Sequence, residues 1–424
     1  MSPDCLQQGK APTELIPAGS LQDGGIACTF AIYYLPLPSG DPFDTVNGLL
    51  TNTFNGFRQA DALHGDETEP TVSASVTVDP HRNYPPPDPE FVGLFNHGVS
   101  PQQAIALQGT QTAFILNFSC PIEHGWGPLR AMQQLTGDLA AATGGLIWDA
   151  ETREMFTPAA WNELRVDRWT GRTPDINDHT IIHAYEIDGK MRVITLGMAK
   201  FGLPDVVVND VPRSACSNVG HLVNVFCQAI AERPMVQHPG EFDLDYRRFK
   251  PNATGAAPLT VKIGRHHDGD PLNRLLEITF DRGPGHDAHA RRRAILAAAF
   301  ESEPSIVPAT HDDAVEAASR RARAKLPALR ALFHQGLPPG ELMQVKAPFE
   351  GPNSIREYMW VDVVSWNGDE ITGLLVNEPF NIPGLRAGQM VVVEQSTVFD
   401  YKHQRRDGTI SGNETEKLVR STLN

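Results

Sequence analysis

Two kinds of apolar spacing alternate along the first half of the chain, and this alternation limits the fold more than any other feature. Short segments are rich in β-branched and aromatic residues or alternate in polarity, which is typical of buried and half-buried strands. These are residues 25–35, 71–78, 112–118, 146–149, 179–187 and 191–196. Longer segments carry apolar residues at helical spacing. These are residues 43–57, 129–142 and 219–230.

The pairing of these strands is indicated by one turn. Asp188 and Gly189 separate two strand-like segments, and Asp-Gly is a strong signal for a tight antiparallel hairpin. An antiparallel pair argues against a doubly wound parallel sheet. The pattern therefore predicts an α+β class and an α/β sandwich with helices on one face of a mixed sheet. The region could also be two strand-helix-strand units.

The rest of the chain divides by composition. Residues 234–258, rich in Pro, Gly and Asn, indicate a linker or an excursion, followed by strands at 259–263 and 274–280. A long helix is expected from Thr310, kinked at Pro327 and ended by Gly336. We expect three parts, which are a sandwich over residues 1–240, a linker with accessory strands and helix over 241–305, and a helix plus β module over 306–424.

Four short strands are expected in the β module, and their tight turns predict a small SH3-like barrel or a meander. The strands are residues 359–364, 371–376, 390–394 and 397–401. Asn367 and Gly368 fit the two central positions of a type I′ turn, which both require positive φ. The long helix is expected to cover one face of these strands.

Motifs in the β module resemble the YegJ-like family, a bacterial domain of unknown function. They are residues 345–349 and 359–361, Gly373, Leu375, Asn377, Pro379, Leu385, Gly388, Asp400 and residues 407–412. The resemblance covers about residues 312–414 and implies kinship without an activity. This chain has Tyr358 where the family often has histidine, and Tyr401 where it often has tryptophan. Residues 197–205 are similar to a motif in uncharacterised bacterial proteins that carry this module.

Charge and cysteine content bear on partners and compartment. The net charge of −15 disfavours non-specific binding to nucleic acid or to an anionic membrane surface. The five cysteines include no Cys-x-x-Cys pair, so no disulfide framework is expected. We find no secretory signal and no apolar run of the roughly 18 residues that a spanning helix needs. These features predict a cytoplasmic protein.

Histidines and cysteines give only weak candidates for a metal site or a nucleophile. His179 and His183 would lie roughly 13 Å apart on a strand, too far for one ion. Cys120 and His124 pair a thiol with an imidazole, but a structural cysteine is the simpler interpretation. The richest set of metal ligands lies between residues 266 and 289, namely His266, His267, His286 and His289. No metal and no cofactor is expected.

Aromatic and polar residues of the β module form the candidate binding surface. They are Tyr358, Trp360, Trp366, Asn377, Pro379, Asp400 and Tyr401. If Tyr358 and Tyr401 lie side by side in one groove, they mark its specificity. The sequence contains no catalytic signature, so we expect a non-enzymatic module that binds a small ligand or another protein. The alternative is a hydrolase that uses the His/Asp cluster at residues 266–289.

Overall fold

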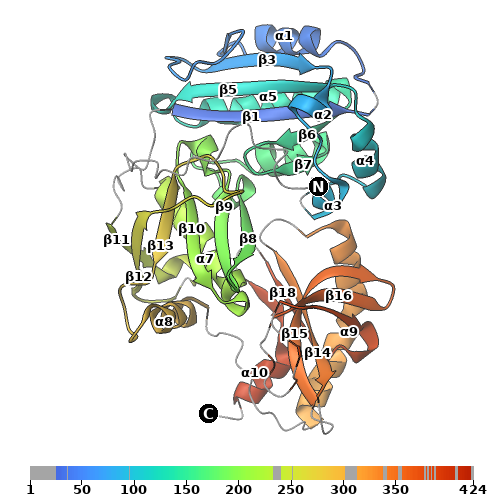
Figure 1. The fold of residues 1–424 in the computed structure, drawn as a ribbon, viewed down its shortest axis with the longest axis vertical. Helices are drawn as coiled ribbons and strands as arrows, with labels where there is room; N and C mark the ends of the chain where they lie inside the picture. Colours follow the sequence, from blue (N-terminus) through green and yellow to red (C-terminus); the bar gives the residue numbers. More distant parts are fainter. Residues whose placement is uncertain are drawn as a thin grey trace.

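The structure, a computed structural model, describes residues 25–421 except 36, 95, 233–239, 251, 301–312, 338–340, 352–355, 377–378, 380–381, 383, 386–387 and 406–408. These described residues form three sheets, of seven, six and six strands. Sheets A, B and C follow one another along the chain, and helices pack against each (Figure 1). The α+β class expected from the sequence is confirmed. No helix in the described ranges is long and apolar enough to cross a membrane.

Sheet A has the strand order β2-β3-β5-β1-β6-β7-β4. Its strands are β1 (Gly25–Tyr34), β2 (Arg58–Gln59), β3 (Thr71–Thr77), β4 (Asn96–His97), β5 (Ala113–Pro121), β6 (Gly145–Asp149) and β7 (Glu154–Phe156). Helices α1 (Pro42–Asn52) and α5 (Gly127–Thr143) cover one face. The short α2 (Pro80–Asn83), α3 (Pro89–Leu94) and α4 (Pro101–Ala106) precede β5, and α6 (Pro158–Trp161) follows β7.

Helix α5 shows why these residues fold as the sequence predicts. Leu129, Met132 and Leu135 recur at helical spacing, and all three are fully buried against the sheet. Gly144 ends the helix in the left-handed conformation (φ 75°), and its N–H donates to the carbonyl of Ala140 at 2.9 Å. Here local capping and burial agree, so the boundaries could be predicted from sequence alone.

Sheet B has the order β11-β12-β13-β10-β9-β8. Its strands are β8 (Ile181–Ile187), β9 (Lys190–Leu196), β10 (Asp205–Val211), β11 (Gly240–Asp245), β12 (Ala256–Ile263) and β13 (Leu275–Thr279). Helices α7 (Cys216–Glu232) and α8 (Ala288–Phe300) follow β10 and β13. Asp188 and Gly189 have φ of 49° and 76°, so the predicted β8–β9 hairpin is confirmed.

Two strands of this middle region were not expected from the sequence. Residues 240–245, expected to belong to a linker or an excursion, form β11 at the edge of sheet B. The internal strand β10 was missed, although its run of three valines from Val206 is fully buried. A short apolar run bounded by prolines cannot be assigned to a strand or a loop from its sequence alone, because the pairing with a neighbouring strand decides between them.

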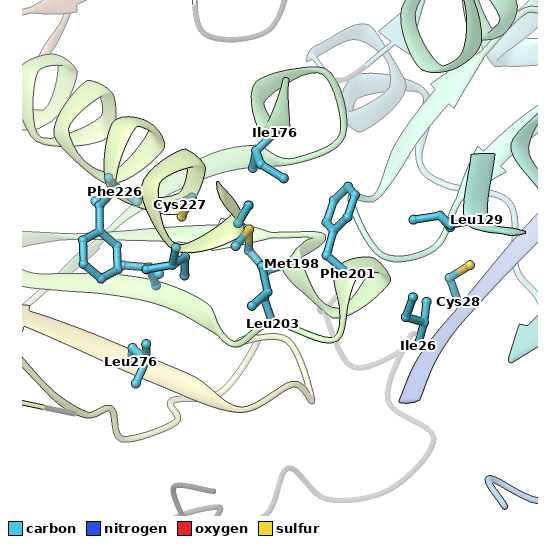
Figure 2. Packing of buried hydrophobic residues seen from close by; sticks show 14 of the residues in the cluster. Ile26, Cys28, Leu129, Ile176, Met198, Phe201, Leu203, Phe226, Cys227 and Leu276 are labelled. Atoms are coloured by element: carbon cyan, nitrogen blue, oxygen red, sulfur yellow. The ribbon is translucent and has the colours of Figure 1, made fainter. Parts of the chain in front are cut away.

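Sheets A and B share one hydrophobic core. The same buried cluster contains Ile26 and Leu129 from the sheet A region and Leu276 from sheet B. Phe201 lies between these two groups (Figure 2). It is carried by the 3-10 turn η6 (Met198–Phe201), which connects β9 to β10. Trp126, from the sheet A side, donates its indole N–H to the carbonyl of Phe201 at 3.2 Å.

Sheet C is antiparallel and has the order β17-β16-β15-β14-β18-β19. Its strands are β14 (Leu342–Glu350), β15 (Arg356–Asn367), β16 (Glu370–Leu375), β17 (Met390–Glu394), β18 (Asp400–Gln404) and β19 (Ile410–Gly412). Helix α9 (Asp313–Gln335) packs on one face, and its Leu326 and Leu329 join the core of this sheet. Helix α10 (Glu414–Ser421) closes the described chain.

The β module differs from its expected form in three respects. Among the described residues, sheet C has six strands where four were expected, because β14 and β19 were not predicted. Within the described residues the sheet is open, because its end strands β17 and β19 do not pair, so no closed barrel is present. Its β14–β17 part is the expected meander. Asn367 pairs with Glu370, so the turn residues are Gly368 and Asp369, and only Gly368 has positive φ. The turn therefore lies one residue later than predicted, and with a single positive φ it is not of type I′. Thr310 lies outside the described residues.

Candidate functional site

A cluster of charged side chains is buried where sheet A meets sheet B. Lys200 on η6 is fully buried, and its ammonium pairs with the carboxylate of Asp149 at the end of β6. Arg165 donates to Glu154 at 2.6 Å and lies 3.5 Å from Asp149. His97 approaches the other oxygen of Glu154 at 2.7 Å. The cluster thus joins four elements of the sheet A region, which carry His97, Asp149, Glu154 and Arg165, to η6 of the sheet B region.

The titration of this cluster follows from burial and pairing. Burial lowers the pKa of Lys200, and Asp149 opposes that effect. For Glu154, burial acts to raise the pKa, but Arg165 and His97 outweigh it and lower the pKa to about 2. The negative charges of Glu154 and Asp149 are therefore balanced by the positive charges of Lys200 and Arg165. Because Lys200 is inaccessible and already paired, the cluster is suited to fastening the two sheets and cannot contact a ligand.

The sequence around Lys200 fits this close approach. Gly197 has φ of 107°, and a Cβ there would lie 2.7 Å from the Thr152 side chain. The carboxylate of Asp205 accepts the hydroxyl of Thr195 at 2.8 Å and the N–H of Met198 at 3.3 Å. Burial raises the pKa of Asp205 to about 6 despite these hydrogen bonds. Residues 197–205, noted in the sequence as a motif, thus form the turn that places Lys200.

The same cluster fixes the turn that carries Glu151. The second oxygen of Asp149 accepts the backbone N–H of Glu151 at 3.1 Å and that of Thr152 at 3.4 Å. Burial raises the pKa of Glu151 to about 7, and the negative charge of Asp149 adds to the effect. Glu151 is half-buried and lines a pocket of about 420 Å³ on sheet A. It therefore changes charge near neutral pH at a surface that a small molecule could reach.

A row of polar side chains crosses three strands of sheet A in this pocket. Asn117 on β5 pairs in register with Thr29 on β1 and with Ser73 on β3. The Thr29 hydroxyl donates to the Asn117 side-chain carbonyl at 2.9 Å, and the Asn117 amide donates to the Ser73 hydroxyl at 3.4 Å. Ser75 and Asp61 add further oxygen atoms to the lining. The pocket is thus rich in hydrogen-bond acceptors.

Further along the same face, the sheet is apolar. Ala31 and Tyr33, two and four residues after Thr29, pack in a separate buried cluster with Val92 and Ala104 from the α3–α4 region. Side chains at every second position of a strand share a face. One face of β1 therefore changes from polar and open to apolar and covered. Sequence reasoning missed this site, because polar residues on one strand face are also typical of simple solvent exposure.

Cys28 lies at the edge of the pocket but is not suited to act as a nucleophile. Burial raises the pKa of its thiol well above the ordinary value, and Glu151 adds to this effect. Cys120 is also buried, and burial together with Glu123 raises its pKa to about 11. His124 is exposed on the following turn, outside the core that holds Cys120. Thiolate chemistry is disfavoured at both cysteines.

The histidines between residues 266 and 289 are not brought together. His266 and His267 precede β13, and His286 and His289 follow it, so the two pairs lie at opposite ends of that strand. A strand of this length separates its ends by roughly 13 Å. Within the described residues, no group of three or more His, Cys, Asp or Glu side chains could hold a metal ion.

Asp270, which lies in the same loop as His266 and His267, binds residues of sheet B. Asp270 binds the buried Arg192 of β9 at 2.6 Å and accepts the Tyr185 hydroxyl at 2.7 Å. These contacts hold residues 265–270 on sheet B. His179 is likewise structural in its contacts, since its ring packs edge-on against Trp169 and Phe201. His183 lies on β8, and burial together with Arg153 lowers its pKa to about 4.

The aromatic residues proposed in the β module do not share one surface. Tyr358 pairs across from Pro348, and Tyr401 across from Val345, so the two tyrosines lie on opposite faces of sheet C. Tyr358 packs against Phe399, with ring centroids 4.5 Å apart. The condition under which these two tyrosines would mark the specificity of one groove is therefore not met.

The tryptophans and the aspartate of this set are buried. Trp366 belongs to the core under α9, whereas Trp360 lies on the other face between Lys346 and Lys402. Asp400 accepts the N–H of Thr415 at 2.9 Å and the hydroxyl of Thr415 at 2.7 Å at the start of α10. Of the remaining two, Pro379 is half-buried and Asn377 lies outside the described residues.

Comparison with known proteins identifies a relationship for the C-terminal quarter of the chain. Residues 312–424 match the model of a bacterial family that is described as "Uncharacterized protein conserved in bacteria (DUF2314)". No curated protein matches the chain. No solved structure matches it either. The β module with its covering helix is therefore similar to a bacterial domain of unknown function.

Proposed function

We propose that this protein binds a small molecule rich in hydrogen-bond donors in the pocket lined by Glu151. The observation that carries the proposal is the polar row of Thr29, Asn117 and Ser73, which lines a pocket where the apolar and covered part of this sheet face ends. Convergent polar groups in a concave site are typical of ligand pockets.

The charges of the pocket favour a ligand that carries an amine or another cation. Glu151 and Asp61 supply carboxylates, and Thr29, Ser73 and Ser75 supply hydroxyl groups. A cation favours the ionised form of Glu151, whose pKa is about 7 in the free protein. Affinity for a cationic ligand should therefore rise between about pH 6 and 8 and level off above that range.

Two further assignments belong to this proposal. The match of residues 312–424 extends, in our interpretation, to the YegJ-like group that the motifs of this module resemble. We also assign the protein to the cytoplasm and to a binding role rather than to catalysis. The binding role is supported by the raised thiol pKa values of Cys28 and Cys120, because a thiol that stays protonated at neutral pH is a poor nucleophile.

The test is a binding screen with variants of the pocket. Polyamines, amino sugars and polyols would be screened by thermal shift, and the Kd of each hit measured by calorimetry. Asn117→Leu and Glu151→Gln should each weaken a true pocket ligand about tenfold or more, because each removes a hydrogen bond to a charged or desolvated group. Binding at pH 6 and pH 8 would test the expected dependence on Glu151.

Matched controls are available on the surface. Asn52→Leu changes an exposed amide on α1, and Glu123→Gln changes an exposed carboxylate outside the pocket. Neither should alter the Kd. A ligand that binds Asn117→Leu, Glu151→Gln and the unaltered protein equally well would bind elsewhere and contradict the proposal. Circular dichroism would establish that each variant is folded.

A further inference from the structure

Strand β17 has an open edge. In the described part of the chain it pairs with β16 alone and ends the order of sheet C. Two backbone hydrogen bonds continue this pairing beyond the strand ends. The N–H of Leu375 donates to the carbonyl of Gln389 at 2.9 Å, and the N–H of Gln395 donates to the carbonyl of Asp369 at 2.7 Å. These bonds define which residues of β17 are directed toward β16.

Antiparallel pairing alternates along a strand, so every second residue bonds the same neighbour. Gln389 and Gln395 bond the β16 side, and by this alternation Val391 and Val393 do so as well. Met390 and Val392, which lie between them, therefore direct their N–H and C=O groups toward the open edge. Glu394 directs its N–H there, whereas its carbonyl already accepts the hydroxyl of Thr397 at 2.8 Å. Such a row of backbone donors and acceptors is a template for an added strand.

The side chains of the same residues are also exposed. Val391 and Val393 point into the core and are 8% and 5% exposed, whereas Met390 and Val392 are 52% and 59% exposed. Edge strands commonly carry lysine or proline that discourages pairing. This strand instead presents two apolar side chains beside an unpaired backbone.

Two glutamates on β16 and β17 favour a partner segment that carries a positive charge. Glu394 pairs directly across from Glu370 on the outer face of the sheet. Like charges in this position repel each other and destabilise the pair. A cation on an added strand, placed next to Glu394, would relieve that repulsion. Apolar side chains two and four residues further along would then contact Val392 and Met390.

We propose that β17 accepts an extended segment of a partner protein as an additional strand of sheet C. The segment carries lysine or arginine at one position and aliphatic residues two and four positions away on the same face. Backbone hydrogen bonds to Val392 and Glu394 supply the attachment, and Met390 with the glutamate pair supplies the selectivity. This site is separate from the pocket on sheet A, and neither proposal depends on the other.

The test uses a defined peptide and the full chain. A fluorescein-labelled Lys-Thr-Val-Thr-Val-Thr-Lys peptide would be titrated by fluorescence anisotropy. Two control peptides carry N-methyl groups on both valine nitrogens, or glutamate in place of both lysines. In an antiparallel addition, lysine and the two valines lie opposite Glu394, Val392 and Met390 and direct their N–H groups to β17. The N-methylated control therefore retains the charge and the side chains but cannot complete the ladder. The unmodified peptide should bind saturably, at least about tenfold tighter than either control.

Variants of β17 separate backbone pairing from charge. Val392→Pro removes one N–H directed to the edge and leaves the bonds of Val391 and Val393 to β16 in place, so affinity should fall about tenfold. Val392→Thr retains that N–H and should lose much less. Glu394→Lys places a cation beside the lysine of the peptide and should abolish binding.

Three results with the peptides, and a fourth from light scattering, would overturn this proposal. The first is that the peptide fails to bind, and the second is that it binds the Val392→Pro variant as tightly as the unaltered protein. The third is equal binding of the N-methylated control, which would reduce the effect to general attraction by an acidic protein. Light scattering of the full chain tests whether a second copy of this chain, and not a partner protein, covers the edge of β17. A dimer that dissociates on Val392→Pro would mean that a second copy covers the edge, and the partner segment would be excluded.

Discussion

The boundary between sheets A and B and the boundary between sheets B and C differ in kind. At the boundary between sheets A and B, the hydrophobic core is continuous, and the paired charges of Lys200 and Asp149 are fully buried inside it. At the second, Arg213 lies against Gly388, and Ser217 donates to Gln404 at 3.4 Å. Sheet C and α9 have a core of their own. Sheets A and B should therefore unfold together, while sheet C should behave as a docked unit.

The physical reason is the cost of removing charge from water. Separating sheets A and B would expose the shared core and break ion pairs that were desolvated on folding. Separating sheet C would break contacts of the kind found at surfaces, which contribute little each. The three predictions below test this difference, from the largest expected effect to the smallest.

Replacement of Lys200 should have the largest effect. Lys200→Met leaves the buried carboxylate of Asp149 without its ammonium partner and should reduce the free energy of unfolding of sheets A and B by about 4 kcal/mol. Urea denaturation would measure this. The matched control is Lys262→Met, which removes an ion pair with Asp281 in which both side chains are about half exposed. It should cost less than about 1 kcal/mol. Equal effects would mean that the buried pair has no special role.

Replacement of Trp366 should affect the other unit alone. This side chain is 1% exposed in the core beneath α9. Trp366→Ala should destabilise sheet C by about 3 kcal/mol through the lost burial and the cavity. Hydrogen exchange with mass spectrometry would report each sheet separately. Faster exchange in β14–β16 with unchanged exchange in β1, β5 and β10 is expected. A parallel change in all three sheets would show a single cooperative unit.

The smallest effect concerns pH and Glu151. Its ordinary pKa is 4.5, and burial raises the pKa to about 7 in the folded protein. The folded state therefore holds this proton more tightly than the unfolded chain. The stability that comes from the protonated group is present below about pH 4.5 and is lost as the pH rises through 7. Glu151→Gln should match the unaltered protein near pH 4 and exceed its melting temperature at pH 8.

The control for this pH experiment is Glu123→Gln, which should show no such divergence between the two pH values. A Glu151→Gln variant that is no more stable at pH 8 than at pH 4, relative to the unaltered protein, would contradict the raised pKa. Because the expected change lies in the sheet A region, the hydrogen exchange of sheet C should be the same in both proteins.

Regular elements with local signals could be predicted well. The start and end of α5, the β8–β9 hairpin and the helix over β14–β16 follow from capping residues, turn residues and apolar spacing close to one another in sequence. Where the sequence signal also depended on strand register, the predicted position was only approximately right. The hairpin turn after β15 is shifted by one residue, because strand register decides between neighbouring turn positions.

The candidate sites could not be predicted in the same way. Thr29 and Asn117 are 88 residues apart, and Lys200 and Asp149 are 51 residues apart, and neither pair has a local pattern. Conversely, Tyr358 and Tyr401 looked similar in sequence but face opposite sides of sheet C. A one-residue difference in strand parity reverses the face of a side chain, so composition alone cannot group residues into a site.

The sequence by itself determined the α+β class, the longer helices and most strands, because propensity, capping and turn chemistry act over a few residues. It also showed that the last quarter of the chain is similar to a bacterial domain of unknown function. Only the tertiary structure decided that sheets A and B share one core, that Lys200 is buried against Asp149, and that a polar pocket opens beside Glu151. These features depend on strand order, register and desolvation, which exist only when distant segments pack together.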